Sequence, residues 1–222
     1  DDDIEVYTDE SQNKVLTKLY NLRQQVKRSE GKPNYCLSDF IAPKNSSKID
    51  WIGAFAVTAG IGVKQLVKEL ENKNDDYSAI MVKAIADRLA EALAERLHQR
   101  VRKEFWAYEL DEHLSKDDLI KEKYKGIRPA PGYPACPDHT EKQKIWDLLE
   151  VEKHIDISLT ESYAMNPAAS VSGWYFAHPN SQYFSVGKIT KEQIEDYAKR
   201  REVAIRETER WLAANLNYNF DM

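Results

Sequence analysis

The chain has 222 residues and a mass of 25.7 kDa, which is long enough for one large domain or two small ones. Hydrophobic residues make up 42% of it and the mean hydropathy is -0.66, values typical of a globular protein and not of a disordered or collagen-like one. The longest apolar run, 51–57, is too short to cross a bilayer. The sequence therefore predicts a globular protein without a membrane span.

Charge and cysteine content narrow the class of protein further. Lysine and arginine total 32 against 37 acids, so the net charge of -5 provides no global field to attract nucleic acid. Cys36 and Cys136 are too few for a disulfide scaffold and are typical of reduced, cytoplasmic proteins. The N-terminus, residues 1–3, lacks the features of a secretory signal, and the missing initiator Met indicates a piece of a longer protein.

The chain opens with a hairpin pattern and a strand-to-helix unit. Near-alternation of apolar and polar residues over 4–8 and 15–22 predicts an antiparallel hairpin. The aromatic and β-branched run 51–58 predicts a buried strand that leads through Gly60 and Gly62 into a helix. The two glycines resemble the start of a phosphate-binding turn, but the third glycine of that motif is absent. A plain tight turn is the alternative interpretation.

A long helix is the strongest prediction. It starts at the cap candidates Asp75 and Asp76 and continues without Gly or Pro to about Tyr108. Apolar residues recur at every fourth position, and each such step exceeds one helical turn by about 40°. This apolar stripe therefore winds around the helix, and we expect either that its two ends contact different neighbours or that the helix bends over a twisted sheet. The stripe consists of Tyr77, Met81, Ile85, Leu89, Leu93, Leu97, Val101 and Phe105.

The second half of the chain predicts helices, a proline loop and a run of strands. The expected elements are a short helix opened by Ser115, a stiff loop at 128–137, a helix at 140–152, a meander of strands at 159–165, 171–177 and 183–189, and two closing helices that begin at Thr190 and Thr208. Strands in runs, not alternating with helices, favour an α+β domain with an antiparallel sheet over a doubly wound one.

Two candidate reactive sites are weak. Cys136 and His139 have a C-x-x-H spacing, but no second pair accompanies them, so no metal site is predicted. Cys136 as a nucleophile needs a base within reach and a lowered pKa, and the sequence indicates neither. We therefore predict no catalytic residue in the chain.

Charged residues carry a stronger binding signal. Asp87, Glu91 and Glu95 follow one edge of the long helix, where like charges repel, so either neighbouring cationic side chains or a cationic ligand near Glu91 must compensate. Arg128 opens the proline loop, which fixes its guanidinium for a two-pronged bond to a carboxylate or for a structural ion pair. Because proline donates no hydrogen bond, the loop is also expected to leave carbonyl oxygens that an adenine amino group could use.

Three motifs together resemble one family. They are GIRPAPGYPACPDHTEK at 126–142, VSGWYF at 171–176 and EDYA at 195–198. The chain resembles the C-terminal activation domain of cobalamin-dependent methionine synthase over practically its whole length.

The resemblance implies a fold and a function. The expected fold is a C-shaped single α+β domain with a twisted antiparallel sheet, flanking helices and an extended groove for S-adenosylmethionine. The expected function is repair: an electron from a flavodoxin-type or other flavoprotein and a methyl group from S-adenosylmethionine reactivate cob(II)alamin. The cobalamin itself is expected on a neighbouring domain of the synthase.

The resemblance also assigns the ligand-binding residues. Arg128 matches the arginine that binds the ligand's carboxylate, and the segment 130–133 matches the wall beside the adenine. Tyr183 and Phe184 match an aromatic pair near the ribose and the sulfonium, although Phe184 stands where a tyrosine is often found. Glu91 matches a glutamate lining the same groove. The expected S-adenosylmethionine-binding residues are thus Arg128, Ala130, Gly132, Tyr133, Tyr183, Phe184 and Glu91.

Two further expectations concern the extent of the chain and its role. The family's domain begins well upstream of the residue that matches Asp1, so residues 1–222 are expected to form one domain that lacks its N-terminal portion. The chain is expected to be one part of a methyltransferase. On its own it is not expected to make methionine. The alternative function is an interaction module that caps the cobalamin domain, with S-adenosylmethionine as a regulator only.

Overall fold

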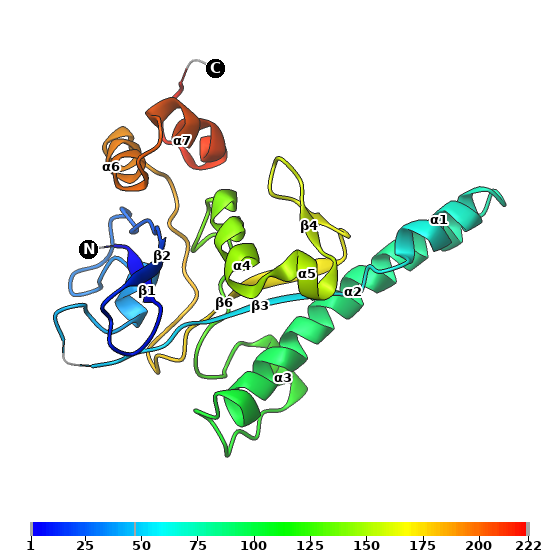
Figure 1. The fold of residues 1–222 in the computed structure, drawn as a ribbon, viewed down its shortest axis with the longest axis horizontal. Coiled ribbons are helices and arrows are strands. Elements are labelled where there is room, and N and C mark those ends of the chain that lie inside the picture. Colours follow the sequence, from blue (N-terminus) through cyan, green and yellow to red (C-terminus); the bar gives the residue numbers. More distant parts are fainter. Residues whose placement is uncertain (1, 47, 221–222) are drawn as a thin grey trace.

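A computed structural model describes residues 2–46 and 48–220; Asp1 lies outside the described residues (Figure 1). The α-helices are α1 (Val63–Glu71), α2 (Asp76–Arg100), α3 (Lys116–Ile120), α4 (Lys142–Leu149), α5 (Val151–Ile155), α6 (Lys191–Arg201) and α7 (Ile205–Trp211). The strands are β1 (Ile4–Tyr7), β2 (Val15–Leu19), β3 (Gly53–Thr58), β4 (Ser158–Leu159), β5 (Met165–Asn166) and β6 (Ser170–Tyr175). Strands β1 and β2, β3 and β6, and β4 and β5 pair antiparallel. The predicted α+β class is confirmed.

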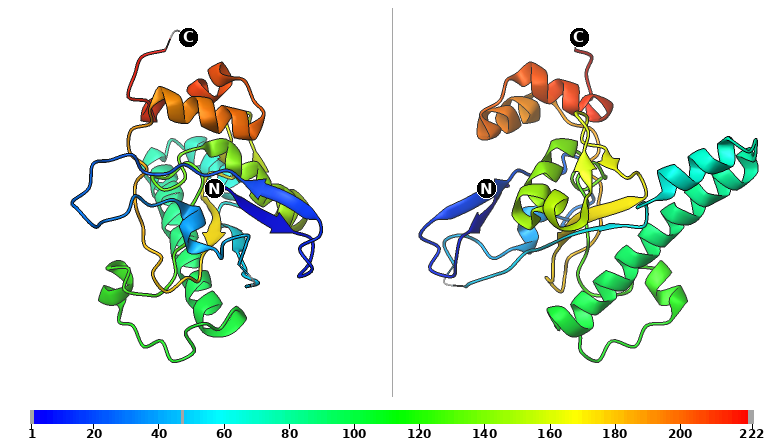
Figure 2. Two further views of the ribbon diagram at one scale, coloured as in Figure 1. Left: turned by 90° about the vertical axis from the view of Figure 1, so that its left-hand side faces the viewer. Right: turned by 45° about the vertical axis from the view of Figure 1, so that its right-hand side comes forward.

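The β3–β6 ladder lies at the centre of the molecule. Its register runs from Gly53 opposite Tyr175 to Thr58 opposite Ser170. Both α2 and α4 contact these two strands, and Figure 2 shows α2 passing across them. Phe55, Val57 and Tyr175 form a core cluster with α2, whereas Trp174 packs in another cluster that includes residues of α4. The sheet is therefore covered by helices on both faces.

The predicted meander is wrong. The first of its three strands is instead a small hairpin, β4–β5, closed by a turn in which the Thr160 amide donates to the Ala164 carbonyl at 2.9 Å. The third, 183–189, belongs to no strand and turns at Gly187, whose φ is 78°; its Val186 amide donates to the Pro134 carbonyl at 2.8 Å. Val186 and Ile189 are fully buried in a cluster with residues of α6 and with Leu212 and Leu216, which follow α7. The apolar pattern there reflects burial and not a ladder.

The long helix is confirmed as α2, which continues as a π-helical segment over Val101–Phe105. Its predicted start is also confirmed, because the Asp75 side chain accepts a hydrogen bond from the Ser78 amide at 3.0 Å. A shorter prediction needs correction. The helix expected at 140–152 is divided at Glu150, whose φ of 46° is left-handed. The break separates α4 from α5 and places Val151 in the core.

The expected role of the apolar stripe is wrong over most of its length. The face of α2 that is buried carries small residues, Ala86, Ala90 and Ala94, and then His98. Small side chains let a helix approach a neighbouring element closely. Only Leu97 and Val101 of the stripe join the core cluster. Its other members, Tyr77, Met81, Ile85, Leu89, Leu93 and Phe105, are exposed. Figure 1 shows the paired helices α1 and α2 projecting from the rest of the molecule.

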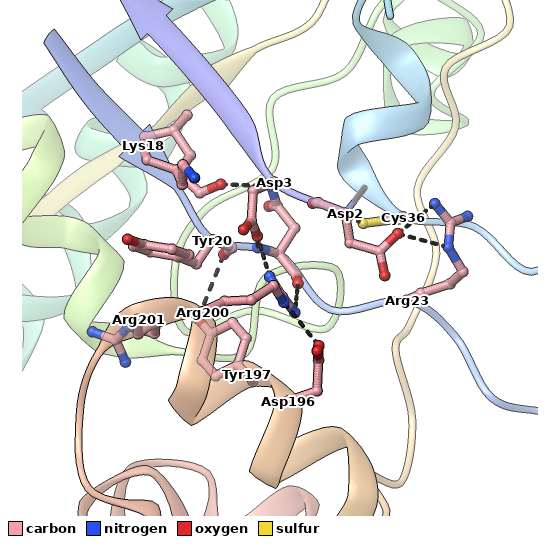
Figure 3. A network of polar contacts seen from close by, with 12 residues as sticks. Asp2, Asp3, Lys18, Tyr20, Arg23, Cys36, Asp196, Tyr197, Arg200 and Arg201 are labelled. Atoms are coloured by element: carbon pink, nitrogen blue, oxygen red, sulfur yellow. Dashed lines mark hydrogen bonds and ion pairs between the residues drawn. The ribbon is translucent and has the colours of Figure 1, made fainter. Parts of the chain in front are cut away.

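Helix α6 is connected to the rest of the chain by charged side chains. On one side, Arg200 pairs with Asp3 beside β1 and with Asp196 of its own helix (Figure 3). On the other side, Asp138 accepts hydrogen bonds from Tyr197 at 2.9 Å and from Arg201 at 2.6 Å. Asp138 follows the proline loop, so these bonds join α6 to that loop. The predicted start of this helix at Thr190 is confirmed, and Thr190 and Gln193 form a capping box there.

We expect Asp138→Ala to lower the free energy of unfolding by about 3 to 5 kcal/mol, because it removes the hydrogen-bonded carboxylate of the mostly buried Arg201 and leaves only the more distant Glu141, at 4.0 Å. Tyr197→Phe removes a single hydrogen bond to the same carboxylate and should lower it by only about 1.5 to 3 kcal/mol. Urea unfolding measures both values. A loss below about 1 kcal/mol for Asp138→Ala would show that this pair does not hold α6 in place.

Candidate functional site

The backbone around Arg128 extends the central sheet. Ile127 and Phe176 exchange two backbone hydrogen bonds of 3.0 Å, and the Trp174 amide donates to the Pro129 carbonyl at 2.9 Å. Residues 127–129 therefore run along the edge of β6. Successive side chains of an extended segment point to opposite sides. Ile127 points into the core, and Arg128 points toward α2.

Three side chains surround the Arg128 guanidinium. Nη2 donates to Glu95 Oε2 at 2.6 Å, and Nη1 donates to the Tyr124 hydroxyl at 3.2 Å. Nη1 also lies 3.1 Å from Nδ1 of His98. Burial works against the charge, but the neighbouring tyrosine hydroxyls and the Glu95 carboxylate raise the pKa of Arg128 above its ordinary value. The side chains of Arg128 and Glu95 keep 20% and 30% of their surface exposed, so solvent reaches the pair.

His98 forms the inner wall of this group. It is fully buried and stacks on Tyr175, with ring centroids 5.1 Å apart, while Tyr124 lies edge-on at 5.0 Å. Burial, together with the charges of Arg102 and Arg128, lowers the pKa of His98 to about 2. The ring is therefore neutral at neutral pH. Because a guanidinium only donates, Nδ1 accepts and the proton lies on Nε2.

Arg102 places a second positive charge beside Tyr124. Its guanidinium carbon lies 4.4 Å from the centre of the Tyr124 ring, against 5.7 Å for that of Arg128. Two hydrogen bonds, of 2.5 and 3.0 Å, join Arg102 to Glu112. Each arginine thus has its own carboxylate, and the site as a whole is close to neutral.

Tyr183 is fixed relative to Arg128. Its hydroxyl accepts a hydrogen bond from the Arg128 amide at 3.0 Å and lies 3.2 Å from the Tyr124 hydroxyl. Phe184, the next residue, is partly buried and packs against the core, with its ring centroid 6.0 Å from that of Tyr35 and 6.4 Å from that of Phe40. The structure therefore brings Tyr183 to Arg128 but places Phe184 among other aromatic residues.

The proline loop is more tightly hydrogen-bonded than the sequence indicates. Carbonyl oxygens expected to be free accept backbone hydrogen bonds: those of Ala130, Tyr133 and Cys136 within the loop, and those of Pro129 and Pro134 from outside it. The prediction of free carbonyls is wrong for these positions, because the loop folds back on itself and lies against β6. Gly132 has a φ of 92°, and a Cβ there would collide with the His139 ring.

A cleft of about 290 Å³ lies beside this loop. Its lining residues are Ala130, Pro131, Tyr133, His139, Lys142, Ser162, Ala164, Met165, Ser170, Val171 and Ser172. The Ser172 hydroxyl is buried and has no hydrogen-bond partner among the described residues. The cleft therefore has apolar residues on the loop side and a buried hydroxyl without a partner in its wall.

Glu91 is exposed, one turn before Glu95 on α2. Among the acids on this edge of α2, Glu95 forms an ion pair with a cation, and that cation, Arg128, comes from another part of the chain. Sequence reasoning also missed His98 and Tyr124. The signal for Glu95 was its place in the acidic run, but the spacing of acids along one helix does not indicate a partner from elsewhere.

The other candidate sites have structural explanations. Gly62 has a φ of 79° and precedes α1, and a Cβ on Gly60 would collide with Pro167. Strand β3 pairs antiparallel, so the plain turn is the better interpretation. Burial raises the pKa of the Cys136 thiol well above its usual range. Within residues 2–46 and 48–220, no cluster of three or more His, Cys, Asp or Glu is suited to a metal, and no helix could span a membrane.

Comparison with known proteins defines the class. The chain belongs to the family of vitamin B12 dependent methionine synthase activation domains, whose family model matches residues 1–202. The chain is similar to a crystal structure of the MetH reactivation domain bound to AdoHcy, with 59% identity and a TM-score of 0.95. The match covers 98% of this chain and 67% of that one. The family resemblance is confirmed, as is the expected α+β fold with antiparallel sheets and flanking helices, and the chain is a domain of a methyltransferase family.

The neutral state of His98 predicts a pH dependence of stability. Below about pH 6.5 an unfolded histidine binds a proton that folded His98 does not, so acid favours the unfolded chain by about 1.4 kcal/mol per pH unit. The free energy of unfolding should therefore fall more steeply from pH 7 to pH 5 in the native chain than in His98→Gln. Urea unfolding at both pH values tests this. Parallel profiles would contradict it, and exposed His113→Gln is the matched control.

Proposed function

We propose that this chain binds S-adenosylmethionine as the methyl donor for reductive methylation of inactive cob(II)alamin held on a neighbouring domain. Three observations support the proposal. The chain belongs to the activation-domain family, and its solved relative is bound to AdoHcy, the molecule that remains when S-adenosylmethionine gives up its methyl group. The third observation, which carries the proposal, is the Arg128 site.

The residues at Arg128 fit the amino-acid end of such a ligand. The described partners take three of the five N–H donors of the guanidinium, so donors remain for a carboxylate. The group is partly buried, which strengthens a charge-assisted hydrogen bond relative to one in water. Glu91, exposed one turn before Glu95, is proposed to face the cationic or hydroxyl groups of the ligand.

The rest of the ligand is proposed to lie along the proline loop. The cleft beside Ala130 and Tyr133 supports a wall for the adenine, and the positive φ of Gly132 gives the loop its close approach to His139. Tyr183, held by the Arg128 amide, is proposed to present its ring near the sulfonium, where an aromatic face favours a cation. Phe184 is proposed to support this ring from the core side.

In this function the chain binds and orients, and the bound S-adenosylmethionine supplies the methyl group. The partners proposed are the cobalamin-binding domain of methionine synthase and a flavodoxin-type or other flavoprotein that delivers the electron. A location in the cytoplasm, where Cys36 and Cys136 would stay free thiols, is part of the proposal. So is the view that residues 1–222 form one domain to which an N-terminal portion belongs.

Arg128→Ala should weaken S-adenosylmethionine binding by about 1.5 to 3 kcal/mol, the contribution of a charge-assisted hydrogen bond. Arg128→Lys should retain only part of the native affinity, because an ammonium cannot form the two parallel hydrogen bonds of a guanidinium. Isothermal titration calorimetry of the three proteins is the measurement. Equal affinities would refute a role of Arg128 in binding the ligand.

A labelled methyl group separates the proposal from the alternative in which the ligand is only a regulator. The chain is mixed with the cobalamin-binding domain in its cob(II) state, a reductant and S-adenosylmethionine labelled at its methyl group. Transfer of label to cobalamin is expected, and Arg128→Ala should slow it at low ligand concentration. Binding without transfer would favour the regulator. Because the isolated chain is expected to lack methionine synthesis, steady formation of methionine from homocysteine would contradict its assigned role.

A further inference from the structure

The hydrogen bonds of Arg128 divide its guanidinium into an occupied side and an open side. Both hydrogens of Nη1 are taken, by His98 and Tyr124, and Nη2 gives one hydrogen to Glu95. Among the described residues, no partner takes the Nε hydrogen or the second hydrogen of Nη2. While these three bonds are in place, a carboxylate ligand can therefore use the Nε hydrogen and the second hydrogen of Nη2 as donors.

His98 and Tyr124 cannot fix this arrangement alone. Both bind Nη1, so of the three hydrogen-bond partners only Glu95 holds Nη2. Neither carries a negative charge, since His98 is neutral and burial raises the pKa of the Tyr124 hydroxyl above its ordinary value. Arg102, also positive, lies over the same Tyr124 ring. Without Glu95, the two arginines would share a single carboxylate, Glu112, and the repulsion between them favours an outward turn of Arg128.

Glu95 has no other partner that explains its position. Its Oε2 binds Arg128 at 2.6 Å, and its Oε1 is buried without a hydrogen-bond partner among the described residues. It lies on α2 one turn before His98, so the same rigid helix positions both groups. Burying a carboxylate oxygen without a partner is unfavourable, and the ion pair with Arg128 offsets this.

We propose that Glu95 is a positioning residue for Arg128, which holds the guanidinium so that its open side faces the carboxylate of the ligand. This inference rests on the proposed function. It assigns Glu95 no contact with the ligand. The inference predicts a selective effect of losing Glu95. Binding should weaken only for ligands that carry the amino-acid carboxylate, and the part of the site that binds the nucleoside should be unchanged.

Calorimetry with two probes tests this selectivity. S-adenosylhomocysteine carries the carboxylate, and 5′-methylthioadenosine has the same nucleoside and sulfur without the amino-acid end. We expect Glu95→Ala to lower the affinity for S-adenosylhomocysteine about tenfold. The affinity for 5′-methylthioadenosine should stay within about twofold of that of the native chain. Glu95→Gln should fall between, because its amide oxygen still accepts from Nη2. Asp87→Asn, which changes an exposed acid two turns earlier, is the matched control and should change neither.

Each other result has a definite meaning. Equal weakening of both probes would make Glu95 a general structural residue and overturn the inference. Tighter binding of S-adenosylhomocysteine by Glu95→Ala would overturn it too, since Glu95 would then compete with the ligand. If Glu95→Ala does not fold, the test uses Glu95→Gln, in which the affinity for S-adenosylhomocysteine should fall relative to that for 5′-methylthioadenosine. A native chain that binds neither probe would refute the proposed function itself, and one that binds both equally would remove the role of Arg128.

Discussion

The hydrogen bond from the Trp174 amide to the Pro129 carbonyl, with the paired bonds between Ile127 and Phe176, attaches the proline loop to the edge of the central sheet. Because the segment is extended there, attachment alone decides that Ile127 enters the core while Arg128 faces α2. The cleft beside the loop follows from the same attachment. A shift of one residue along β6 would exchange the two side chains and remove the cation from the site.

The sequence predicted those elements whose pattern has a local cause. The capped start of α2, the β1–β2 hairpin and the strand β3 all appear where expected. The apolar stripe of α2 was misjudged because periodicity shows that a helix has distinct faces but not which face a neighbour covers. In α2 the buried face carries alanines. The segment 183–189 was misjudged for a related reason, since Val186 and Ile189 are buried without a ladder.

Part of the candidate site could also be predicted. Arg128 and Tyr183, assigned from the family's motifs, do lie together, joined through the Arg128 amide. The residues that hold the guanidinium could not be found, because Glu95 and His98 precede it by about thirty positions and their contact depends on how α2 crosses the sheet. A contact between residues this far apart produces no repeating pattern in a single sequence.

The unequal packing of α2 gives the helix a gradient of local stability. Toward its N-terminus it packs on α1 in a projecting hairpin, and toward its C-terminus it packs on β3 and β6 (Figure 1). Backbone amides near Tyr77 should therefore exchange their hydrogens with solvent through local opening, whereas those near Ala94 should exchange only when the core opens. Glu95 and His98 lie in the slowly exchanging half, so fraying of the hairpin tip does not reach the site.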